Sequence, residues 1–357
     1  MNLDDLDRFA RVDSLGMINE INGLPAQLYK AWQLGQALDL PPWKGIRQVV
    51  VAGMGGSATG ADLLAAYVAP ICSVPIYIHR DYDLPAWAIG GETLVIGSSH
   101  SGNTEETLSA FHTGLANGCR SIALTTGGKL AQAAAEANVP LWLFKHKGQP
   151  RSAVGFSFAL LLSALVRLNL LDHPGNELED ALSAMQRQQI SLLAQVPVTK
   201  NPAKRIAGQL VGRWVDVIGA GVLAPVARRW KNQLCEVGKA WASFDVLPEA
   251  DHNSLEGIIN PGDFISKTMV LFLRAGSIYP ANRMRLDLTR KTMMLEGVNT
   301  DFIDAQGETR LAQQWTSLHH GDYVAYYLAM AYEVDPSPVM TIESFKREMQ
   351  SAEAGSV

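Results

Sequence analysis

Short apolar runs alternate with longer amphipathic segments between residues 48 and 145. The runs are four or five residues long, and the segments between them repeat apolar positions every three or four residues, as helices do. Runs without polar alternation are typical of parallel strands that helices cover on both faces. The pattern predicts strands at residues 48–52, 75–78, 93–97, 121–124 and 140–144 and helices at 57–68, 104–117 and 129–138.

The remaining chain extends this arrangement on both sides. An apolar helix, a polar helix and a linker with two prolines, which disfavour a helix, follow the first unit. A strand, a glycine turn and a helix then recur, which predicts strands near 215–221 and 268–273 and helices at 225–237, 281–295, 323–332 and 342–349. We therefore predict an α/β chain in four parts: a helical cover at 1–47, a parallel-sheet domain at 48–150, a helical connector at 151–202, and a second parallel-sheet domain with C-terminal helices at 203–357.

Composition and charge narrow the class of protein. At 357 residues, 47% of them hydrophobic, the chain is long enough for two buried cores. Its formal net charge of −5 argues against general binding to nucleic acid or to an acidic membrane. The longest apolar run, residues 156–171, contains Arg167 and is too short to span a bilayer.

The cysteines and the N-terminus indicate a location. Cys72, Cys119 and Cys235 are scattered without the spacing of a zinc site, which fits a reducing compartment. The chain begins with an acidic segment that lacks the layout of a signal peptide. We therefore expect a cytoplasmic enzyme or regulator that binds no metal.

A turn rich in hydroxyl groups follows the third predicted strand. Ser98, Ser99, Ser101 and Thr104 lie within seven positions, with Gly102 between them, and a predicted helix follows. Ser101 or Thr104 can cap that helix, and acidic residues suit its first turn. Backbone N–H groups and hydroxyls directed at one point suit a phosphate monoester. The alternative is an ordinary capped helix behind a polar loop.

A second turn of small residues, 53–58, follows the first predicted strand. It can be read as the G-x-G-x-x-A fingerprint of dinucleotide binding, and Arg80 after the second strand could then meet a 2′-phosphate. The carboxyl ends of parallel strands meet at one edge of a sheet, where ligands bind. Two short turns at that edge fit a phosphate cradle better than an extended pyrophosphate groove.

Two charged residues could act on such a ligand. Arg151 lies at the junction of the two halves, where it could reach the ligand or remain a solvated loop cation. Glu236 ends an otherwise basic helix among apolar neighbours. A carboxylate in an apolar niche has a raised pKa and suits proton abstraction. The alternative is an ion pair with Arg229 or Lys239.

Two further residues stay ambiguous from their surroundings alone. His252 lies between Asp251 and a polar loop, where it could move protons or cap a turn. Lys346 is on the last predicted helix, where its position is that of a surface lysine.

Taken together, these motifs resemble those of one family, the bifunctional phosphoglucose/phosphomannose isomerases of the sugar isomerase (SIS) superfamily. The similarity runs through nearly the whole chain and is carried in order by residues 54–57, 99–107, 150–151, 230–236, 248–253, 335–338 and Lys346. It implies an α/β fold with two SIS-type, flavodoxin-like domains, each a parallel sheet flanked by helices.

The resemblance also implies a role for each site residue. Arg151 corresponds to the arginine that stabilises an enediolate, and Glu236 to the base that moves a proton between C1 and C2. His252 corresponds to a residue that assists ring opening, with Lys346 at the ring oxygen. The positions that hold the sugar phosphate are Gly56, Ser57, Ser99, Ser101 and Thr104.

The implied reaction interconverts glucose 6-phosphate and mannose 6-phosphate with fructose 6-phosphate through a cis-enediol. It requires one base, a charge-stabilising group and a ring-opening acid, without a metal or other cofactor. In this superfamily such a histidine typically comes from the other subunit, so the resemblance implies a homodimer in which His252 is lent across the interface. The chain departs from the family pattern at Ala58-Thr59, at His100 and beside Glu236, and none of these departures removes a group that the mechanism requires.

Three other functions compete with this one. A sugar-phosphate sensor without catalysis would keep the turns, but the four candidate catalytic residues and the lack of a DNA-binding segment disfavour it. Isomerisation coupled to amination normally comes with a glutaminase domain and an N-terminal cysteine, which this sequence lacks. A nucleotide-dependent oxidoreductase is the remaining alternative, and nicotinamide binding would identify it.

Overall fold

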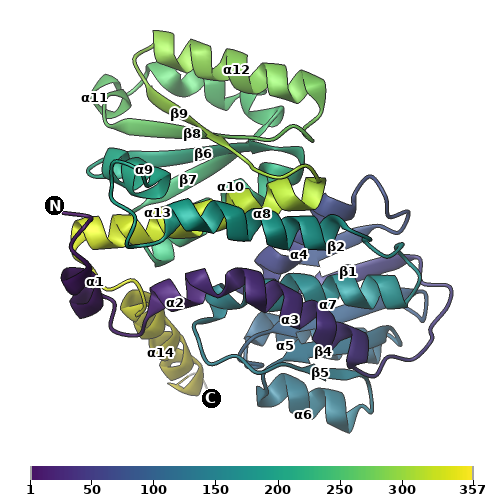
Figure 1. The fold of residues 1–357 in the computed structure, drawn as a ribbon. Coiled ribbons are helices and arrows are strands. Elements are labelled where there is room, and N and C mark those ends of the chain that lie inside the picture. The colour runs from purple at the N-terminus through teal and green to yellow at the C-terminus, as the bar shows by residue number, and fades with distance from the viewer. Residues whose placement is uncertain (1, 356–357) are drawn as a thin grey trace.

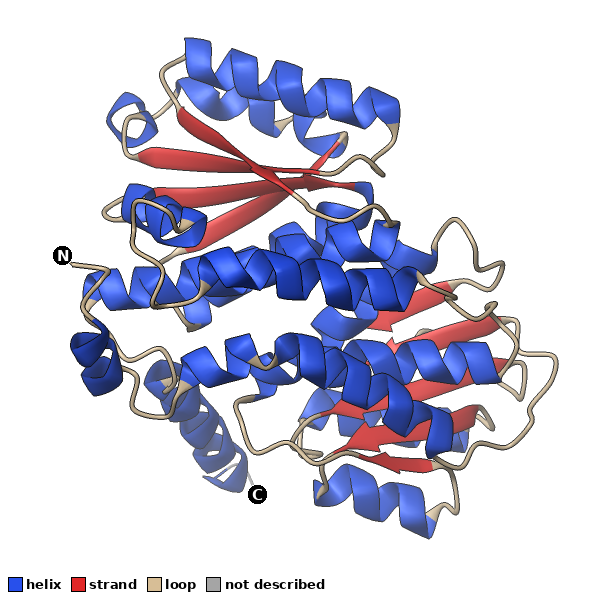
Figure 2. Ribbon diagram, viewed as in Figure 1, coloured by secondary structure: helices blue, strands red, loops and turns tan. Residues whose placement is uncertain are grey.

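The computed structural model describes residues 2–355 and contains two parallel β-sheets (Figures 1 and 2). The first sheet has the order β2-β1-β3-β4-β5, which is the order of flavodoxin-like folds. Its strands lie within about two residues of their predicted bounds: β1 (Gln48–Ala52), β2 (Ile76–His79), β3 (Thr93–Ser99), β4 (Arg120–Thr125) and β5 (Leu141–Leu143).

The second sheet has the order β7-β6-β8-β9, and all of its neighbouring strands are also parallel. Its strands are β6 (Trp214–Ala220), β7 (Ala242–Leu247), β8 (Thr268–Arg274) and β9 (Asn299–Asp304). The sequence pattern did not identify β7 and β9, because these two edge strands are only partly buried and carry polar residues. The predicted fold class, two flavodoxin-like α/β units, is confirmed.

Helices cover both faces of the first sheet. Helices α5 and α6 form an apolar cluster of their own with β4, while α7 packs against α3 and α4 (Figure 1). The helices of this half are α1 (Leu6–Val12), α2 (Met17–Asn22), α3 (Leu24–Ala37), α4 (Gly55–Val68), α5 (Glu105–Ala116), α6 (Gly128–Glu136) and α7 (Val154–Arg167), with the 3-10 turn η1 (Pro150–Ala153) before α7.

Helix α13 (Arg310–Tyr332) is buried along nearly its whole length and lies beside α8 between the two sheets (Figure 1). It is longer than the helix predicted at 323–332. The prediction missed the first half of this helix because buried polar residues there interrupt the apolar pattern. The other elements are α8 (Glu177–Leu192), α9 (Pro202–Leu210), α10 (Ala224–Glu236), α11 (Gly262–Ile265), α12 (Pro280–Leu295), α14 (Met340–Gly355), and the 3-10 turns η2 (Gly221–Leu223), η3 (Glu249–His252) and η4 (Ser254–Ile259).

The linker predicted at 196–202 ends in an unpredicted helix. Pro202 is in the first turn of α9, and the Asn201 side chain caps this helix by accepting a hydrogen bond from the Lys204 N–H at 3.1 Å. A proline is tolerated there because the first N–H groups of a helix have no partner within it. None of the helices in residues 2–355 is long and apolar enough to cross a membrane.

Candidate active site

Two turns lie side by side at the carboxyl edge of the first sheet. Strands β1 and β3 are parallel neighbours, with Ala52 in register with Gly97, so the turns that follow them meet. The contact is close, because a Cβ on Gly53 would lie 2.8 Å from the Ser98 carbonyl oxygen. This junction is the topological switch point of the sheet, where open α/β folds bind ligands.

The first turn leads directly into α4, which begins at Gly55. Gly56 and the buried Ser57 therefore lie in the first turn of a helix, where backbone N–H groups point outward and the helix dipole is positive. A Cβ on Gly56 would lie 2.7 Å from the Pro150 carbonyl oxygen and 3.1 Å from Arg151 Cα. Glycine at this position thus allows the Arg151 segment to pack against the start of the helix.

The second turn is held by its own hydroxyl groups. Ser99 Oγ lies 2.9 Å from Thr104 Oγ1 and accepts the Gly102 N–H at 3.1 Å. Gly102 has φ +68°, and a Cβ there would collide with the Gly127 carbonyl. Thr104 is the N-cap residue of α5, but its hydroxyl does not cap the helix, nor does that of Ser101, which accepts the Asn103 N–H at 3.2 Å. Thr104 thus holds the N-cap position, as one of the two predicted candidates, but without a side-chain capping hydrogen bond.

Arg151 is buried beside these turns and is not a solvated loop cation. Its Nη2 donates to the carbonyl oxygens of Pro336 and Ser337 at 2.9 and 2.5 Å, while Nε has no hydrogen-bond partner among the described residues. Burial lowers the pKa of Arg151 from its ordinary value, and the charge of Glu236 opposes this change. The guanidinium therefore keeps one unused donor near the turns.

Glu236 is the last residue of α10, and its carboxylate lies 3.9 Å from Arg151 Nη1. The predicted apolar niche is wrong, because the side chain is 29% exposed and faces this cation. Arg229, one of the two ion-pair partners considered for Glu236, instead forms a bidentate pair with Asp322 at 3.1 and 2.9 Å. A carboxylate that is accessible and next to a guanidinium can take up a proton while the guanidinium stabilises a developing anion.

A buried ion pair supports Arg151 from behind. Arg229 Nη1 donates to the Arg151 carbonyl oxygen at 2.7 Å, and both Arg229 and Asp322 are almost completely buried. Because Asp322 neutralises Arg229, this contact fixes the Arg151 backbone without leaving an uncompensated charge. No local pattern indicated that Asp322, in the middle of α13, has this role.

Lys239 is a second cation that the sequence analysis considered only as an ion-pair partner of Glu236. Its Nζ donates to the carbonyl oxygens of Glu236 and Pro338 at 2.6 and 2.5 Å. Burial, followed by the positive charge of Arg151, lowers the pKa of Lys239. Its backbone has φ +53°, which is uncommon for a residue with a side chain and fits a position just after a helix end.

Two of the predicted catalytic residues do not join this cluster. His252 is exposed on η3, which follows the carboxyl end of β7. Glu236 lies near the amino end of the same strand, because its neighbour Cys235 contacts the carbonyl oxygen of Ala242. Six residues of parallel strand span about 16 Å, so His252 and Glu236 lie at opposite edges of the second sheet. Lys346 is exposed on α14.

The structure also bears on the competing dinucleotide site. Arg80, the residue expected to meet a 2′-phosphate, is paired with Asp62 of α4. No group of three or more His, Cys, Asp or Glu side chains within residues 2–355 could hold a metal ion. The charged residues Glu236 and Lys239 meet at Arg151.

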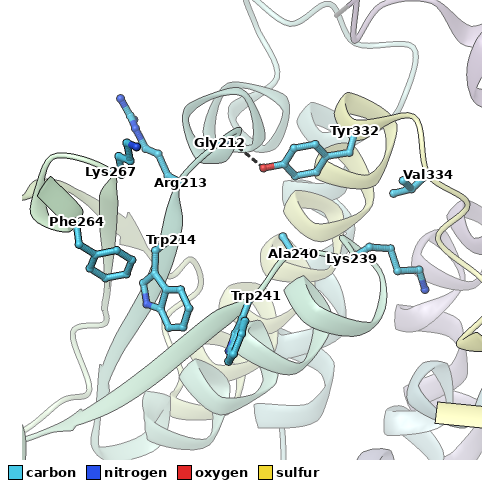
Figure 3. Close-up of a pocket in the computed structure, with 10 residues that line it drawn as sticks. All are labelled: Gly212, Arg213, Trp214, Lys239, Ala240, Trp241, Phe264, Lys267, Tyr332 and Val334. Atoms are coloured by element: carbon cyan, nitrogen blue, oxygen red, sulfur yellow. Dashed lines mark hydrogen bonds between the residues drawn. The ribbon is translucent and has the colours of Figure 1, made fainter. Parts of the chain in front are cut away.

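A cavity of about 550 Å³ adjoins the cluster on the side of Lys239 (Figure 3). Trp214, Trp241 and Phe264 line it together with Tyr332, whose hydroxyl accepts the Gly212 N–H at 2.7 Å. It lies at the amino edge of the second sheet, since Trp214 is the first residue of β6. The cavity is therefore separate from the two turns of the first sheet.

Comparison with known proteins places the chain in a family. Residues 199–349 match the family described as bacterial phospho-glucose isomerase C-terminal SIS domain. A bifunctional phosphoglucose/phosphomannose isomerase of Caldicellulosiruptor bescii is 36% identical over 93% of this chain and 98% of its own, and one of Aquifex aeolicus is 33% identical over 88% and 93%.

Solved structures agree on the fold. A hypothetical protein of Thermus thermophilus superposes with a TM-score of 0.75 over 98% of this chain and 93% of its own, at 16% identity. The identity to the two curated relatives over most of both chains shows that the chain belongs to the bifunctional phosphoglucose/phosphomannose isomerase family.

Proposed function

We propose that this protein is an aldose–ketose isomerase that interconverts glucose 6-phosphate and mannose 6-phosphate with fructose 6-phosphate. One observation carries the proposal: the Glu236 carboxylate and the Arg151 guanidinium lie 3.9 Å apart beside two turns suited to a phosphate. The relatives named as bifunctional isomerases match this chain over nearly all of its length, which supports the same activity here.

The residues divide into binding and chemistry. Gly56, Ser57, Ser99, Ser101 and Thr104 hold the phosphate, through N–H groups at a helix start and through hydroxyls. Binding of this remote group orients the sugar so that C1 and C2 face Glu236.

Glu236 takes the proton from one of these carbons and returns it to the other, while Arg151 stabilises the negative charge of the cis-enediolate. Glucose 6-phosphate and mannose 6-phosphate differ only at C2 and share one enediol, so one base serves both. Lys346 acts at the ring oxygen, which requires α14 to approach the site.

Ring opening requires a group that gives and takes up a proton, and the resemblance to the family assigns this role to His252. His252 lies at the opposite edge of the second sheet and is exposed, as a residue used by another subunit would be. We assign it to the site of a partner in a homodimer. A cytoplasmic location fits the three free cysteines.

The test is proton NMR of the purified protein with fructose 6-phosphate in deuterium oxide, with EDTA present and no nucleotide. We expect both aldose phosphates to appear with deuterium at C2, because the transferred proton exchanges on the carboxylate. Glucose 6-phosphate alone would restrict the activity to one substrate. Saturable binding of fructose 6-phosphate without product would contradict the proposal and indicate a sensor.

A further inference from the structure

A chain of hydrogen bonds reaches the phosphate turn from outside the site. His100 Nε2 lies 3.0 Å from His146 Nδ1, and His146 Nε2 lies 3.0 Å from Glu20 Oε2. Glu20 is on α2, His146 follows β5, and His100 stands between the phosphate-turn residues Ser99 and Ser101. Three segments far apart in the sequence therefore converge on one residue of the turn.

The surroundings of the two imidazoles are closely packed. The His100 ring packs edge-on against Phe144, and His146 packs edge-on against Phe156, with ring centroids 5.9 and 6.0 Å apart. A Cβ on Gly148 would lie 2.6 Å from Glu20 Oε1 and 2.8 Å from His146 Cε1. The side chain of His146 is 8% exposed, so its two ring nitrogens depend on these partners for hydrogen bonds.

Proton positions along the chain follow from the chemistry of its end. A carboxylate only accepts hydrogen bonds, so His146 Nε2 carries a hydrogen that it donates to Glu20. One further hydrogen lies between His146 Nδ1 and His100 Nε2, and the bond persists while only one of these nitrogens carries it. Burial, and then the charge of His146, lower the pKa of His100 to about 4, so His100 is neutral at pH 7 and the bond is kept.

The backbone of His100 is fixed as well. Its carbonyl oxygen accepts the Thr126 N–H at 3.1 Å and the Thr126 hydroxyl at 2.7 Å. With the backbone held by Thr126 and the ring held by His146, the turn has little freedom on either side of residue 100. Hydroxyls preorganised in this way bind an anion without first having to be ordered.

We propose that Glu20 and His146 are positioning residues for the phosphate site, which act through the ring of His100 on the turn at 99–104. The proposal rests on the proposed function for the identity of the bound group, a phosphate monoester. Glu20 and His146 act on the turn through His100, so we expect their effect to fall on binding of the phosphate and not on proton transfer at Glu236.

The test compares two substitutions of the same histidine. His146→Phe keeps a ring and loses both hydrogen bonds, whereas His146→Gln keeps one acceptor and one donor. We expect H146F to raise both KM for fructose 6-phosphate and the dissociation constant of inorganic sulfate about tenfold, with kcat within about twofold. H146Q restores most of the affinity, and His112→Phe on the exposed face of α5 serves as the control without effect.

Sulfate binding, measured by calorimetry, separates this proposal from the proposed function. If H146F turns over substrate and its sulfate affinity is unchanged, the positioning role is overturned, while the proposed isomerase function still stands. Absence of turnover in the wild type, with affinity still lost in H146F, would overturn only the isomerase. An equal loss of sulfate affinity in H146Q and H146F would mean that His146 acts through its shape and not through its hydrogen bonds, which would contradict the proposal. Should H146F fail to fold, Glu20→Ala on the partly exposed α2 is expected to weaken sulfate binding about threefold.

Discussion

The two α/β units share strand order and parallel pairing, but the carboxyl edges of their sheets are used differently. In the first unit, the turns after β1 and β3 end in small and hydroxyl residues beside helix starts. In the second, side chains of α13 occupy the corresponding edge: the buried Gln314 donates to the Val222 carbonyl oxygen at 3.1 Å, and Gln313 accepts the Ser277 N–H at 2.9 Å. We call the edge of the second unit closed, because side chains of α13 form hydrogen bonds with the turns after β6 and β8. We call that of the first unit open, because the corresponding turns carry hydroxyls and the N–H groups of helix starts.

The second unit contributes side chains to the candidate site from the amino edge of its sheet. Glu236 is the last residue of α10 and Lys239 follows this helix, close to the amino end of β7, and both meet the Arg151 segment of the first unit. Under the proposed function, one unit binds the anion and the other supplies the base. The repeated fold is thus a scaffold, and its two copies have different chemistry because different ends of their elements carry polar side chains.

The largest expected effect tests the contribution of the second unit. Glu236→Gln keeps the size of the side chain but removes the base, and we expect kcat to fall about a thousandfold or more, as is typical of a lost general base. The affinity for fructose 6-phosphate should change by less than about threefold. Glu296→Gln, at the exposed end of α12, is the control. If E236Q keeps substantial turnover, measured by isomer formation, Glu236 is not the base.

The second prediction concerns the closed edge of the second unit. Gln314 is fully buried and also donates to the Leu63 carbonyl oxygen at 3.0 Å, so it joins the two units. Gln314→Leu should lower the free energy of unfolding by about 2 kcal/mol, because carbonyls lose a buried donor. Urea denaturation measures this effect, with Gln186→Leu on the exposed face of α8 as control. A loss below about 0.5 kcal/mol would mean that Gln314 does not hold this edge.

Sequence patterns predicted the difference between the two carboxyl edges only in part. Continuous apolar strands and the hydroxyls of residues 98–104 predicted the first unit and its turns, because both signals are local. The closed edge of the second unit depends on Gln313 and Gln314 of α13, which are more than 35 residues from the turns that they satisfy. Polar residues in a fully buried helix give no periodic signal, since their partners are set by the tertiary fold.

The cluster around Glu236 shows the same limit. Its apolar neighbours in the sequence predicted an apolar niche, but the structure brings Arg151 to 3.9 Å from a part of the chain 85 residues away. Lys239 became part of the cluster through its hydrogen bond to Pro338, which no local pattern encodes. Short-range patterns therefore predicted which residues carry chemistry better than they predicted the environment of each one.

The third prediction compares one serine near the carboxyl end of β3 in the first unit with one near the carboxyl end of β8 in the second. Ser99→Ala removes the hydroxyl that contacts Thr104 and accepts the Gly102 N–H, so we expect KM for fructose 6-phosphate to rise about tenfold. Ser277→Ala, in the turn after β8, removes a hydroxyl without a partner among the described residues and should leave KM unchanged. Steady-state kinetics measure both. Equal effects of the two substitutions would contradict the difference between the edges.

The fourth prediction concerns the dependence of stability on pH in the first unit. The pKa of His100, at about 4, lies below the ordinary value of 6.5, because burial and then His146 disfavour its charged form. The unfolded chain therefore binds more protons between these values, and the contribution of this group to stability, complete above pH 6.5, is lost as the pH falls toward 4.

Of the groups that face His100, His146 follows β5 and Glu20 reaches it through His146 from α2. His100→Asn cannot be protonated, so between pH 6.5 and 5 its free energy of unfolding should fall less than that of the wild type. The difference cannot exceed about 1.4 kcal/mol per pH unit, because one proton is involved. Urea titrations at both pH values measure it, with His112→Asn as control. Parallel curves for H100N and the wild type would show that His100 is not held neutral, and the open edge would then lack the proton arrangement inferred for its turn.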